Sequence, residues 1–299
     1  MPMLRAFAFL LAFLAAASAT GARASDDMGT VSAHPVLWTV HGKGGTVYLL
    51  GSLHLLPANV AWHTPEIDTA LAASDVFVFE APTDASGQAE AAQFVAEHGT
   101  LPRGEALSHL LPPSALPDYA YAIETTHVAP ELIDTKEPWL AALIFEVALM
   151  REHDYDPANG IDRQVFGYAA ARGRNVRYFE SVKQQLTLIA PKDGKLAIDE
   201  FVTDLREFRH EHDDVGAIVT AWEHGDVATI DRLMNSELAK EPEAKKALLD
   251  DRNRAWIARL DRMLAEKKTF FVTVGCAHLA GPTGVPALLR AQGYQVEGP

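Results

Sequence analysis

The sequence predicts an α/β protein with a central mixed β-sheet that is flanked by helices and interrupted by a large helical insertion. Strand-like runs lie near both ends of the chain, while the middle shows mainly the apolar spacing of helices. One apolar run closes with Gly51 and His54, and a second, near the C-terminus, closes with Gly275 and His278. A single sheet completed by strands from both ends of the chain accounts for this arrangement.

The first 24 residues are predicted to be a secretory signal peptide. Arg5 precedes an uncharged apolar run over residues 6–17, and residues 22–24 supply the small residues of a cleavage site. This run is short for a membrane span, although an uncleaved anchor is the alternative. We therefore expect residues 25–299 to form one domain that is periplasmic or secreted after cleavage near Ala24, without stable membrane insertion.

Composition narrows the class of partner. The formal net charge of −14 disfavours nucleic acid and anionic lipid, and it is compatible with cations and with neutral or basic substrates. Cys276 is the only cysteine, so the chain has no internal disulfide, which favours a periplasm-like compartment. No Gly-x-Ser-x-Gly elbow, P-loop or His-Glu-x-x-His motif occurs. The sequence leaves the oligomeric state open.

The N-terminal elements follow from local signals. Two β-rich runs at 36–40 and 46–50 flank a glycine-rich link and predict a hairpin. A helix is expected over 65–73, with Thr64 as its N-cap and proline at its first position. The apolar run at 75–80 predicts a third strand, which we expect beside the first motif strand. Residues 25–34 are polar and expected to be loose.

The remainder is predicted as helices with two further short strands. Ser181 is expected to cap a helix, with Gln184 at the capping-box position. The predicted helices cover 86–98, 113–127, 136–151, 161–172, 181–190, 195–209, 215–224, 227–238, 242–267 and 284–291, and the strands cover 175–179 and 294–296.

His54 and His278 are the first candidates for chemistry. Each follows a strand and a glycine, and residues just past strand ends line the ligand crevice of an open α/β sheet. Neutral imidazole is a common metal ligand and a general base near neutral pH. The alternative for either histidine alone is a structural role, but the repeated context predicts that the two face each other across a divided site.

Glu80 ends the third predicted strand. A carboxylate there is a metal ligand, a general base or a solvated strand terminus. Two histidines and one glutamate leave open positions on a divalent metal, as a catalytic site requires. Mn, Co, Fe and Zn all suit such ligands.

Four further polar residues are candidates for supporting roles. Glu180 orients a ligand histidine or simply precedes the capped helix. Asp162 lies near a helix start, where the helix dipole favours it. Arg252 and Asn253 lie on a long charged helix, on which a solvated face is the default for Arg252.

Two other features are interpreted as unrelated to chemistry. His210 and His212 are two residues apart and cannot share a helix face, so that stretch is expected to be a polar junction between helices. Cys276 lies inside the second motif, but the first motif has no cysteine to match it. The histidines, which occur in both copies, explain the repeated motif better than the cysteine does.

The chain resembles the TraB/GumN family, relatives of the Tiki proteases, through motifs that occur in order over nearly all of residues 25–299. These motifs are Gly51-Ser52-Leu53-His54-Leu55, Phe79-Glu80, Gly160-Ile161-Asp162, Phe179-Glu180-Ser181, Asp251-Arg252-Asn253, Gly275-Cys276-Ala277-His278-Leu279 and the closing segment 288–296.

The resemblance implies a superfamily shared with erythromycin-esterase-like and haem-uptake ChaN-like proteins, with an α/β core built from two related halves. It also implies a metal-dependent hydrolase whose site uses His54, His278 and Glu80, with polar support from Arg252 and Asn253. The presence of Cys276 departs from the small residue common at that position. Because a fold hosts many activities, peptidase activity is an analogy at this point.

The functional hypothesis is an exported metal-dependent hydrolase, most simply a peptidase, for a peptide or small-molecule substrate. His54 and His278 hold a divalent ion, and Glu80 is a ligand or deprotonates the bound water. A non-catalytic protein that binds haem, metal or a small ligand in the same crevice is the alternative, and an esterase is a third possibility.

Overall fold

The computed structural model describes residues 29–190, 194–208 and 211–299 and has the predicted α/β class. In these residues a six-stranded mixed sheet is accompanied by a two-stranded one, β1–β4. The strands are β1 Val31–Ser32, β2 Leu37–His41, β3 Thr46–Ser52, β4 Val60–Ala61, β5 Val76–Phe79, β6 Asn175–Tyr178, β7 Thr269–Gly275 and β8 Gln295–Glu297.

Helices occupy most of the remaining described residues. The α-helices are α2 Pro65–Ala73, α3 Ala85–His98, α4 Leu107–Leu110, α5 Leu116–Thr126, α6 Pro130–Ile133, α7 Pro138–Glu152, α8 Ile161–Ala171, α9 Val182–Ile189, α10 Gly194–Glu207, α11 Glu211–Glu223, α12 Val227–Ile230, α13 Ser236–Leu238, α14 Pro242–Lys245, α15 Asp251–Ala265 and α16 Val285–Ala291. Short 3₁₀ turns occur at η3 Pro113–Ala115, η4 Pro157–Asn159 and η7 Cys276–Leu279, and π-helical turns at η5 Asp231–Asn235 and η6 Lys246–Asp250.

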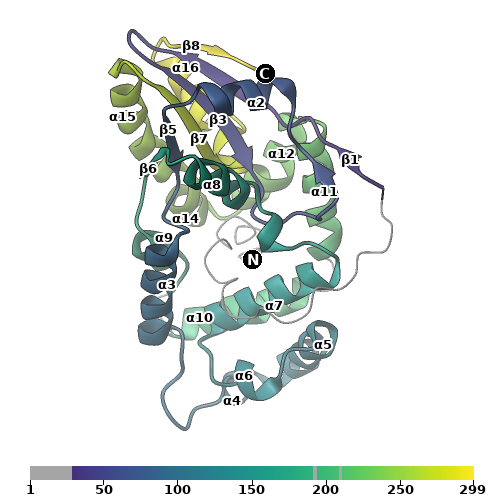
Figure 1. Cartoon of the computed structure of the whole chain (residues 1–299). Helices are drawn as coiled ribbons and strands as arrows, with labels where there is room; N and C mark the ends of the chain where they lie inside the picture. The colour runs from purple at the N-terminus through teal and green to yellow at the C-terminus, as the bar shows by residue number, and fades with distance from the viewer. Residues whose placement is uncertain (1–28, 191–193, 209–210) are drawn as a thin grey trace.

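The main sheet has the strand order β6-β5-β7-β3-β2-β8. The four strands from β6 to β3 are parallel, whereas β2 runs antiparallel to both β3 and β8. Strands from both ends of the chain therefore complete one sheet, as predicted (Figure 1). The expectation that β5 lies beside β3 is wrong, because β7, from the C-terminal part of the chain, pairs with both and separates them.

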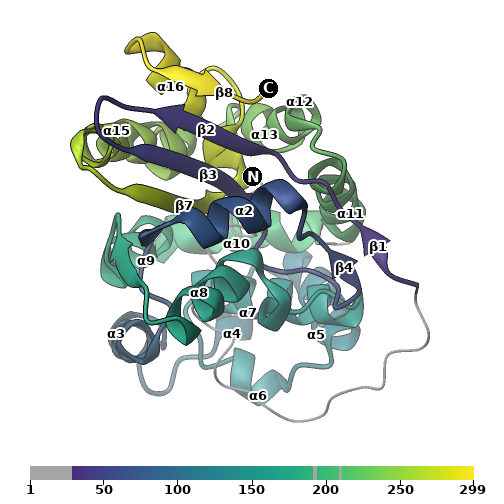
Figure 2. The same cartoon turned by 45° about the horizontal axis from the view of Figure 1, so that its top comes forward.

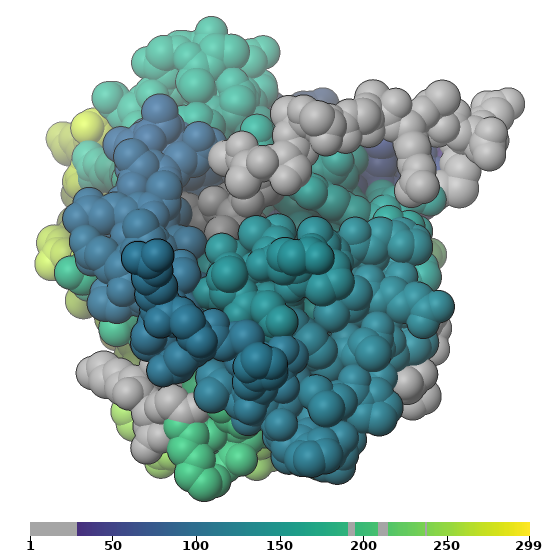
Figure 3. All heavy atoms as spheres, turned by 90° about the horizontal axis from the view of Figure 1, so that it is seen from below, coloured from purple at the N-terminus to yellow at the C-terminus, as the bar shows by residue number. Residues whose placement is uncertain are grey.

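The sheet is covered by helices on both faces, and a third core lies in the helical insertion. On one face, β3 and β7 pack against α2, α8 and α11, and on the other against α15 and α16 (Figure 2). The third core joins α3, α5, α7, α9 and α10. Seen from below, the helices between β5 and β6 make up most of that face of the molecule (Figure 3).

Several element boundaries confirm the local signals. Helix α2 spans the predicted residues, and the Thr64 side chain accepts a hydrogen bond from the backbone N–H of Ile67. Ser181 and Gln184 form the predicted capping box at the start of α9. In the described residues no helix is both long enough and apolar enough to cross a membrane. The side chains of the predicted junction at His210 and His212 lie outside the described residues, as do residues 1–28.

Three local predictions were wrong. Residues 31–32, expected to be loose, pair with β4 as strand β1. The helices expected over 227–238 and 242–267 are each interrupted by a π-helical turn, η5 and η6. Both interruptions matter for the site, because they adjoin residues that contact the second histidine motif.

Candidate active site

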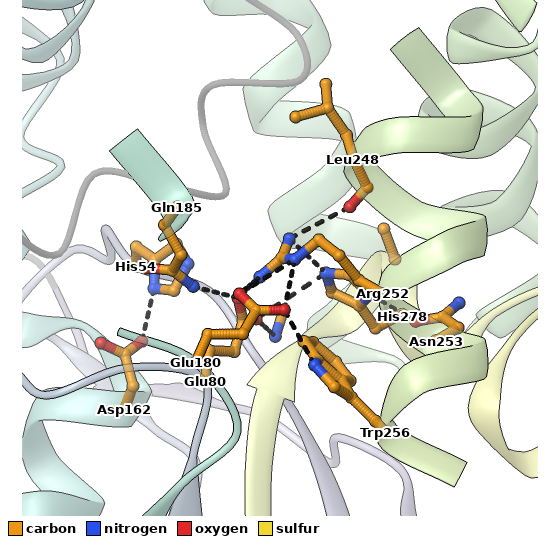
Figure 4. Close-up of polar contacts among 12 residues, drawn as sticks. His54, Glu80, Asp162, Glu180, Gln185, Leu248, Arg252, Asn253, Trp256 and His278 are labelled. Atoms are coloured by element: carbon orange, nitrogen blue, oxygen red, sulfur yellow. Dashed lines mark hydrogen bonds and ion pairs between the residues drawn. The ribbon is translucent and has the colours of Figure 1, made fainter. Parts of the chain in front are cut away.

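The strands place four candidate side chains at one edge of the sheet. His54 lies two residues after β3, Glu80 one residue after β5, Glu180 two after β6, and His278 three after β7. Because these four strands are parallel neighbours, their carboxyl ends meet, as Figure 4 shows. Glu80 and its neighbour strand are joined directly, since the backbone N–H of Gly275 donates to Glu80 Oε1 over 2.7 Å.

His54 is held by Asp162. Its Nδ1 lies 2.7 Å from Asp162 Oδ1, and since a carboxylate only accepts, Nδ1 carries the proton and donates. The other nitrogen, Nε2, is buried and has no hydrogen-bond partner among the described residues. Burial opposes the charge of the ring, but the Asp162 carboxylate outweighs burial and raises the pKa of His54 above its ordinary value.

Gly160 explains how Asp162 reaches His54. A Cβ at Gly160 would lie 2.4 Å from the carbonyl oxygen of His54, so only glycine allows the start of α8 to approach so closely. The next residue, Ile161, donates its backbone N–H to the carbonyl of Leu53 over 3.0 Å. The helix-start role predicted for Asp162 is correct, and the same position makes it the partner of His54.

His278 is held on all sides. Its Nδ1 lies 2.6 Å from Asn253 Oδ1, and the Asn253 amide is oriented by its Nδ2, which donates to the carbonyl of Thr283. Nδ1 of His278 therefore donates, and Nε2 accepts from Arg252 over 3.1 Å. The Trp256 ring lies 4.4 Å from the imidazole, centroid to centroid. Burial and the Arg252 charge lower the pKa of His278 to about 3, so the ring is neutral.

Arg252 is the centre of the cluster, and the default of a solvated face for it is wrong. The side chain is only 7% exposed, because it points inward from α15 between strand ends. Its Nε donates to Glu180, NH1 donates to Leu248 and His278, and NH2 donates to Glu80 and Glu180. All five guanidinium N–H groups are thus used within the protein, and none is left for a substrate.

Glu80 is an ionised, fully paired carboxylate. Oε1 accepts from Gly275, and Oε2 accepts from Gln185 at 3.0 Å and from Arg252 at 2.5 Å. Burial works against the charge, but Arg252 and the two histidines outweigh it and lower the pKa of Glu80 to about 2. The interpretation of Glu80 as a solvated terminus is therefore wrong, since the residue is 8% exposed.

The model of the TraB/PrgY/gumN family matches residues 36–298. The chain belongs to this family. The match spans both histidine motifs and all seven candidate site residues, and it confirms the resemblance drawn from the motifs. No curated protein matched the chain.

In this TraB/PrgY/gumN family chain, Glu180 orients an arginine instead of the predicted histidine. Its carboxylate accepts from Arg252 Nε and NH2, and Trp256 Nε1 donates to its Oε1 over 2.9 Å. The capping role falls to its neighbour Ser181, as predicted. Glu180 therefore holds the guanidinium from the side opposite Glu80.

Sequence reasoning missed Trp256 and Gln185. Trp256 lies three and four residues after Asn253 and Arg252, so helical spacing places all three on one face of α15. That spacing is a signal that could have identified it. Gln185 lies on α9 among buried apolar residues and donates to Glu80. Nothing in the local sequence distinguishes it from a solvated helix residue.

The donor set matches a divalent cation only in part. With neutral rings, the three carboxylates Glu80, Glu180 and Asp162 and the one guanidinium give the cluster a formal charge of −2, and the buried Nε2 of His54 lacks a partner. However, His278 Nε2 accepts from Arg252 and lies 3.9 Å from Glu80 Oε1. Among the described residues no group of three or more His, Cys, Asp or Glu lies close enough together to hold a metal ion.

Cys276 does not act as a nucleophile in this arrangement. The thiol is buried, and burial raises its pKa to about 12, so the reactive thiolate is absent near neutral pH. The Cys276 Sγ contacts Met234 Sδ at 3.7 Å. This agrees with the prediction that the histidines explain the repeated phrase.

Proposed function

We propose that this TraB/PrgY/gumN family protein is a hydrolase, of peptide bonds in the first instance, with its active site at the cluster around His54 and Glu80. The state of His54 carries the proposal: the ring is held by Asp162, its pKa is raised, and its buried Nε2 has no partner among the described residues. An imidazole oriented by an aspartate, with its second nitrogen available, is the arrangement of a general base.

The proton chemistry follows from this arrangement. Where no ion is bound, His54 Nε2 takes a proton from the attacking water and returns it to the leaving group, while Asp162 stabilises the positive ring in between. Arg252 has no donor left for the substrate, so its part is to keep Glu80 ionised and in place. His278 is neutral and does not compete with His54 for protons.

The metal-dependent form of the proposal assigns a divalent ion, Mn, Co, Zn or Fe, to Nε2 of His54, Nε2 of His278 and Glu80. The negative formal charge of the cluster and the unpartnered Nε2 support it. A bound ion would polarise the scissile carbonyl and lower the pKa of water. This form requires Arg252 to release its contact with His278.

A metal-independent form is the second candidate, and the contact between Arg252 and His278 favours it. In this form His278 accepts from the guanidinium throughout and positions it, and His54 with Asp162 carries out the acid–base chemistry alone. The two forms use the same residues, but they give His54 different roles. Its Nε2 binds the ion together with His278 and Glu80 in the metal-dependent form, and it takes the proton from water in the metal-independent form.

The experiment is a hydrolysis assay of the purified protein on panels of peptides and simple esters, combined with elemental analysis and chelation. Activity that follows metal content and is lost with chelator supports the metal-dependent form, and activity unchanged by chelator supports the other. Retention of a ligand such as haem, lost in Glu80→Gln, without hydrolysis of any substrate would replace the proposal with a binding function.

A matched control is available on the surface. His63 donates from its ring to Asp68 over 2.6 Å, as His54 does to Asp162, but both residues are exposed. His54→Ala is expected to abolish hydrolysis, whereas His63→Ala is expected to leave it unchanged. Equal effects of the two substitutions would refute the assignment of His54 as the base.

We also propose export, with cleavage near Ala24, on the basis of the charged and apolar N-terminal pattern. N-terminal sequencing of the protein recovered from the periplasmic fraction is expected to begin at Ser25. Recovery of the uncleaved chain from the cytoplasm would contradict it.

A further inference from the structure

We propose that Trp222 and Asn235 are positioning residues that fix the two histidine turns relative to each other. The inference rests on the proposed function and extends it to the helical stretch from α11 to η5, to which no catalytic group has been assigned. Trp222 lies on α11 and Asn235 in the π-helical turn η5, only 13 residues apart in the chain. Each holds a main-chain carbonyl of one of the repeated Gly-x-x-His motifs.

Trp222 holds the first motif. Its indole Nε1 donates to the carbonyl of Gly51 over 2.8 Å, and the side chain is buried in the core under the sheet. Gly51 is the residue at which β3 ends its apolar run, three residues before His54. A buried carbonyl that lost this donor would be left without its partner, so the bond is an energetic constraint on where the turn lies.

Asn235 holds the second motif. Its Nδ2 donates to the carbonyls of Ala277 and Ala280, each at 3.2 Å, on either side of His278. The orientation of the amide is fixed by Asp231, whose Oδ1 accepts from the same Nδ2 over 2.9 Å. The carbonyls of the turn that carries His278 are therefore anchored to η5.

Gly281 shows how tightly the turn and η5 fit together. Its backbone has φ of +73°, and a Cβ there would lie 2.0 Å from Asp231 Oδ1. On the opposite side, Met234 contacts Cys276 through their sulfur atoms. The turn is thus in contact with η5 at several points between Cys276 and Gly281.

Positioning matters because, among the residues that the structure describes, no hydrogen bond joins the two imidazoles to each other. His54 is held by Asp162 on α8, and His278 by Asn253 on α15, so the rings are oriented from separate helices. Strands β3 and β7 pair up to Ser52 and Gly275, and the helical stretch that contains Trp222 and Asn235 adds contacts to both motifs. It therefore further constrains how the two turns lie relative to each other. Small displacements of such groups are costly for catalysis.

The test compares Trp222→Phe, Asn235→Ala and the double variant with the wild type. Each single substitution is expected to lower kcat by roughly tenfold or more with KM within about twofold, because alignment is lost while the binding surface stays. The kcat of the double variant is expected to lie only slightly below that of the less active single variant. Both substitutions disturb the same alignment of the two histidines, so their effects are not additive.

Trp62→Phe is the matched control. Trp62 is also buried, and its Nε1 donates over 3.1 Å to the side chain of Gln164, which belongs to neither motif. This variant is expected to lose thermal stability comparably to Trp222→Phe but to keep wild-type kcat. If all three single variants lower kcat in proportion to their loss of stability, the role of Trp222 and Asn235 is only structural and the proposal fails.

A second measurement needs no substrate and separates this inference from the proposed function. In the NMR spectrum of the ring nitrogens, Trp222→Phe is expected to shift the resonances of His54 and Asn235→Ala those of His278, while Trp62→Phe shifts neither. Shifted rings in a protein that hydrolyses nothing would support positioning and reject the hydrolase. Unmoved rings in an active protein would reject positioning alone.

Discussion

Arg252 donates to Nε2 of His278 over 3.1 Å, and this contact links the charge balance of the site to the state of its second histidine. The guanidinium lies between the buried carboxylate of Glu80 and the partly buried carboxylate of Glu180, and its positive charge balances both. His278 completes the acceptors around it. Removing any member of this set leaves another with an unpaired buried group.

Arg252→Met is therefore expected to be the most destabilising substitution in the site. It leaves Glu80 and Glu180 buried as like charges without a counter-charge, at a cost of about 3–5 kcal/mol. Urea denaturation monitored by circular dichroism measures it. The control is Arg254→Met on the same helix, where the side chain is exposed and pairs with Asp251, and a change within about 1 kcal/mol is expected. Equal losses for the two variants would contradict the central role of Arg252.

Asp162→Asn is expected to keep the fold and reduce activity by roughly 10²- to 10⁴-fold, because the amide no longer selects the tautomer in which Nε2 of His54 is free. Steady-state kinetics on the substrate found in the panel measure it. Asp68→Asn, which alters the exposed pair with His63, serves as the control and is expected to leave the activity unchanged. Wild-type activity in Asp162→Asn would remove the general-base assignment.

Gly160→Ala is expected to destabilise the protein by about 1–3 kcal/mol and to lower activity, because the new Cβ meets the His54 carbonyl at 2.4 Å. Gly167 lies in the same helix with no atom within 4 Å of an added Cβ, so Gly167→Ala is expected to stabilise by up to about 1 kcal/mol. Thermal unfolding of both variants gives the comparison. The structure requires that Gly160→Ala lowers the melting temperature and that Gly167→Ala raises it.

Stability is expected to fall in acid in two steps. His278 has a pKa of about 3 in the folded protein against an ordinary 6.5, so the unfolded chain binds the proton more readily. Its contribution is fully present above about pH 6.5 and is lost between there and pH 3, at up to about 1.4 kcal/mol per pH unit. Glu80, with a pKa of about 2 against 4.5, adds a second loss between those values.

His54 contributes in the opposite sense. Its pKa is raised in the folded protein, so its contribution is present below the ordinary value of 6.5 and is lost as the pH rises through the higher folded value. Free energies of unfolding measured from pH 3 to 8 test the contributions of both histidines. The variant His278→Gln is the comparison for His278, and its stability is expected to lack the slope between pH 6.5 and 4.5. An unchanged slope in that variant would show that another group titrates there.

Much of the fold could be predicted because it depends on local signals. The helix after Thr64 and the capping box at Ser181 are determined by residues a few positions apart. The order of the strands depends instead on which distant segments pair, and nothing local shows that β7 enters between β3 and β5. The residues of the π-helical turns η5 and η6 likewise show no pattern that distinguishes them from the α-helices on either side.

The convergence of the candidate side chains could be predicted where a strand end identifies them, but it was missed where burial decides. His54, Glu80 and His278 follow strands, and the sheet brings them to one edge, although the metal assigned to them remains a proposal. Arg252 lies on a helix rich in exposed charges, so its burial depends on the carboxylates that meet it from β5 and β6. Spacing alone cannot reveal such a partner.

The position of β7 has a consequence for synthesis. This strand lies at the middle of the sheet, yet it begins at Thr269 of a 299-residue chain, and β8 pairs with β2 only after that. A nascent polypeptide therefore cannot complete this sheet until residues 269–297 have left the ribosome. Truncated products are expected to be inert, and a chain that crosses a membrane before folding would acquire its chemistry only at its destination.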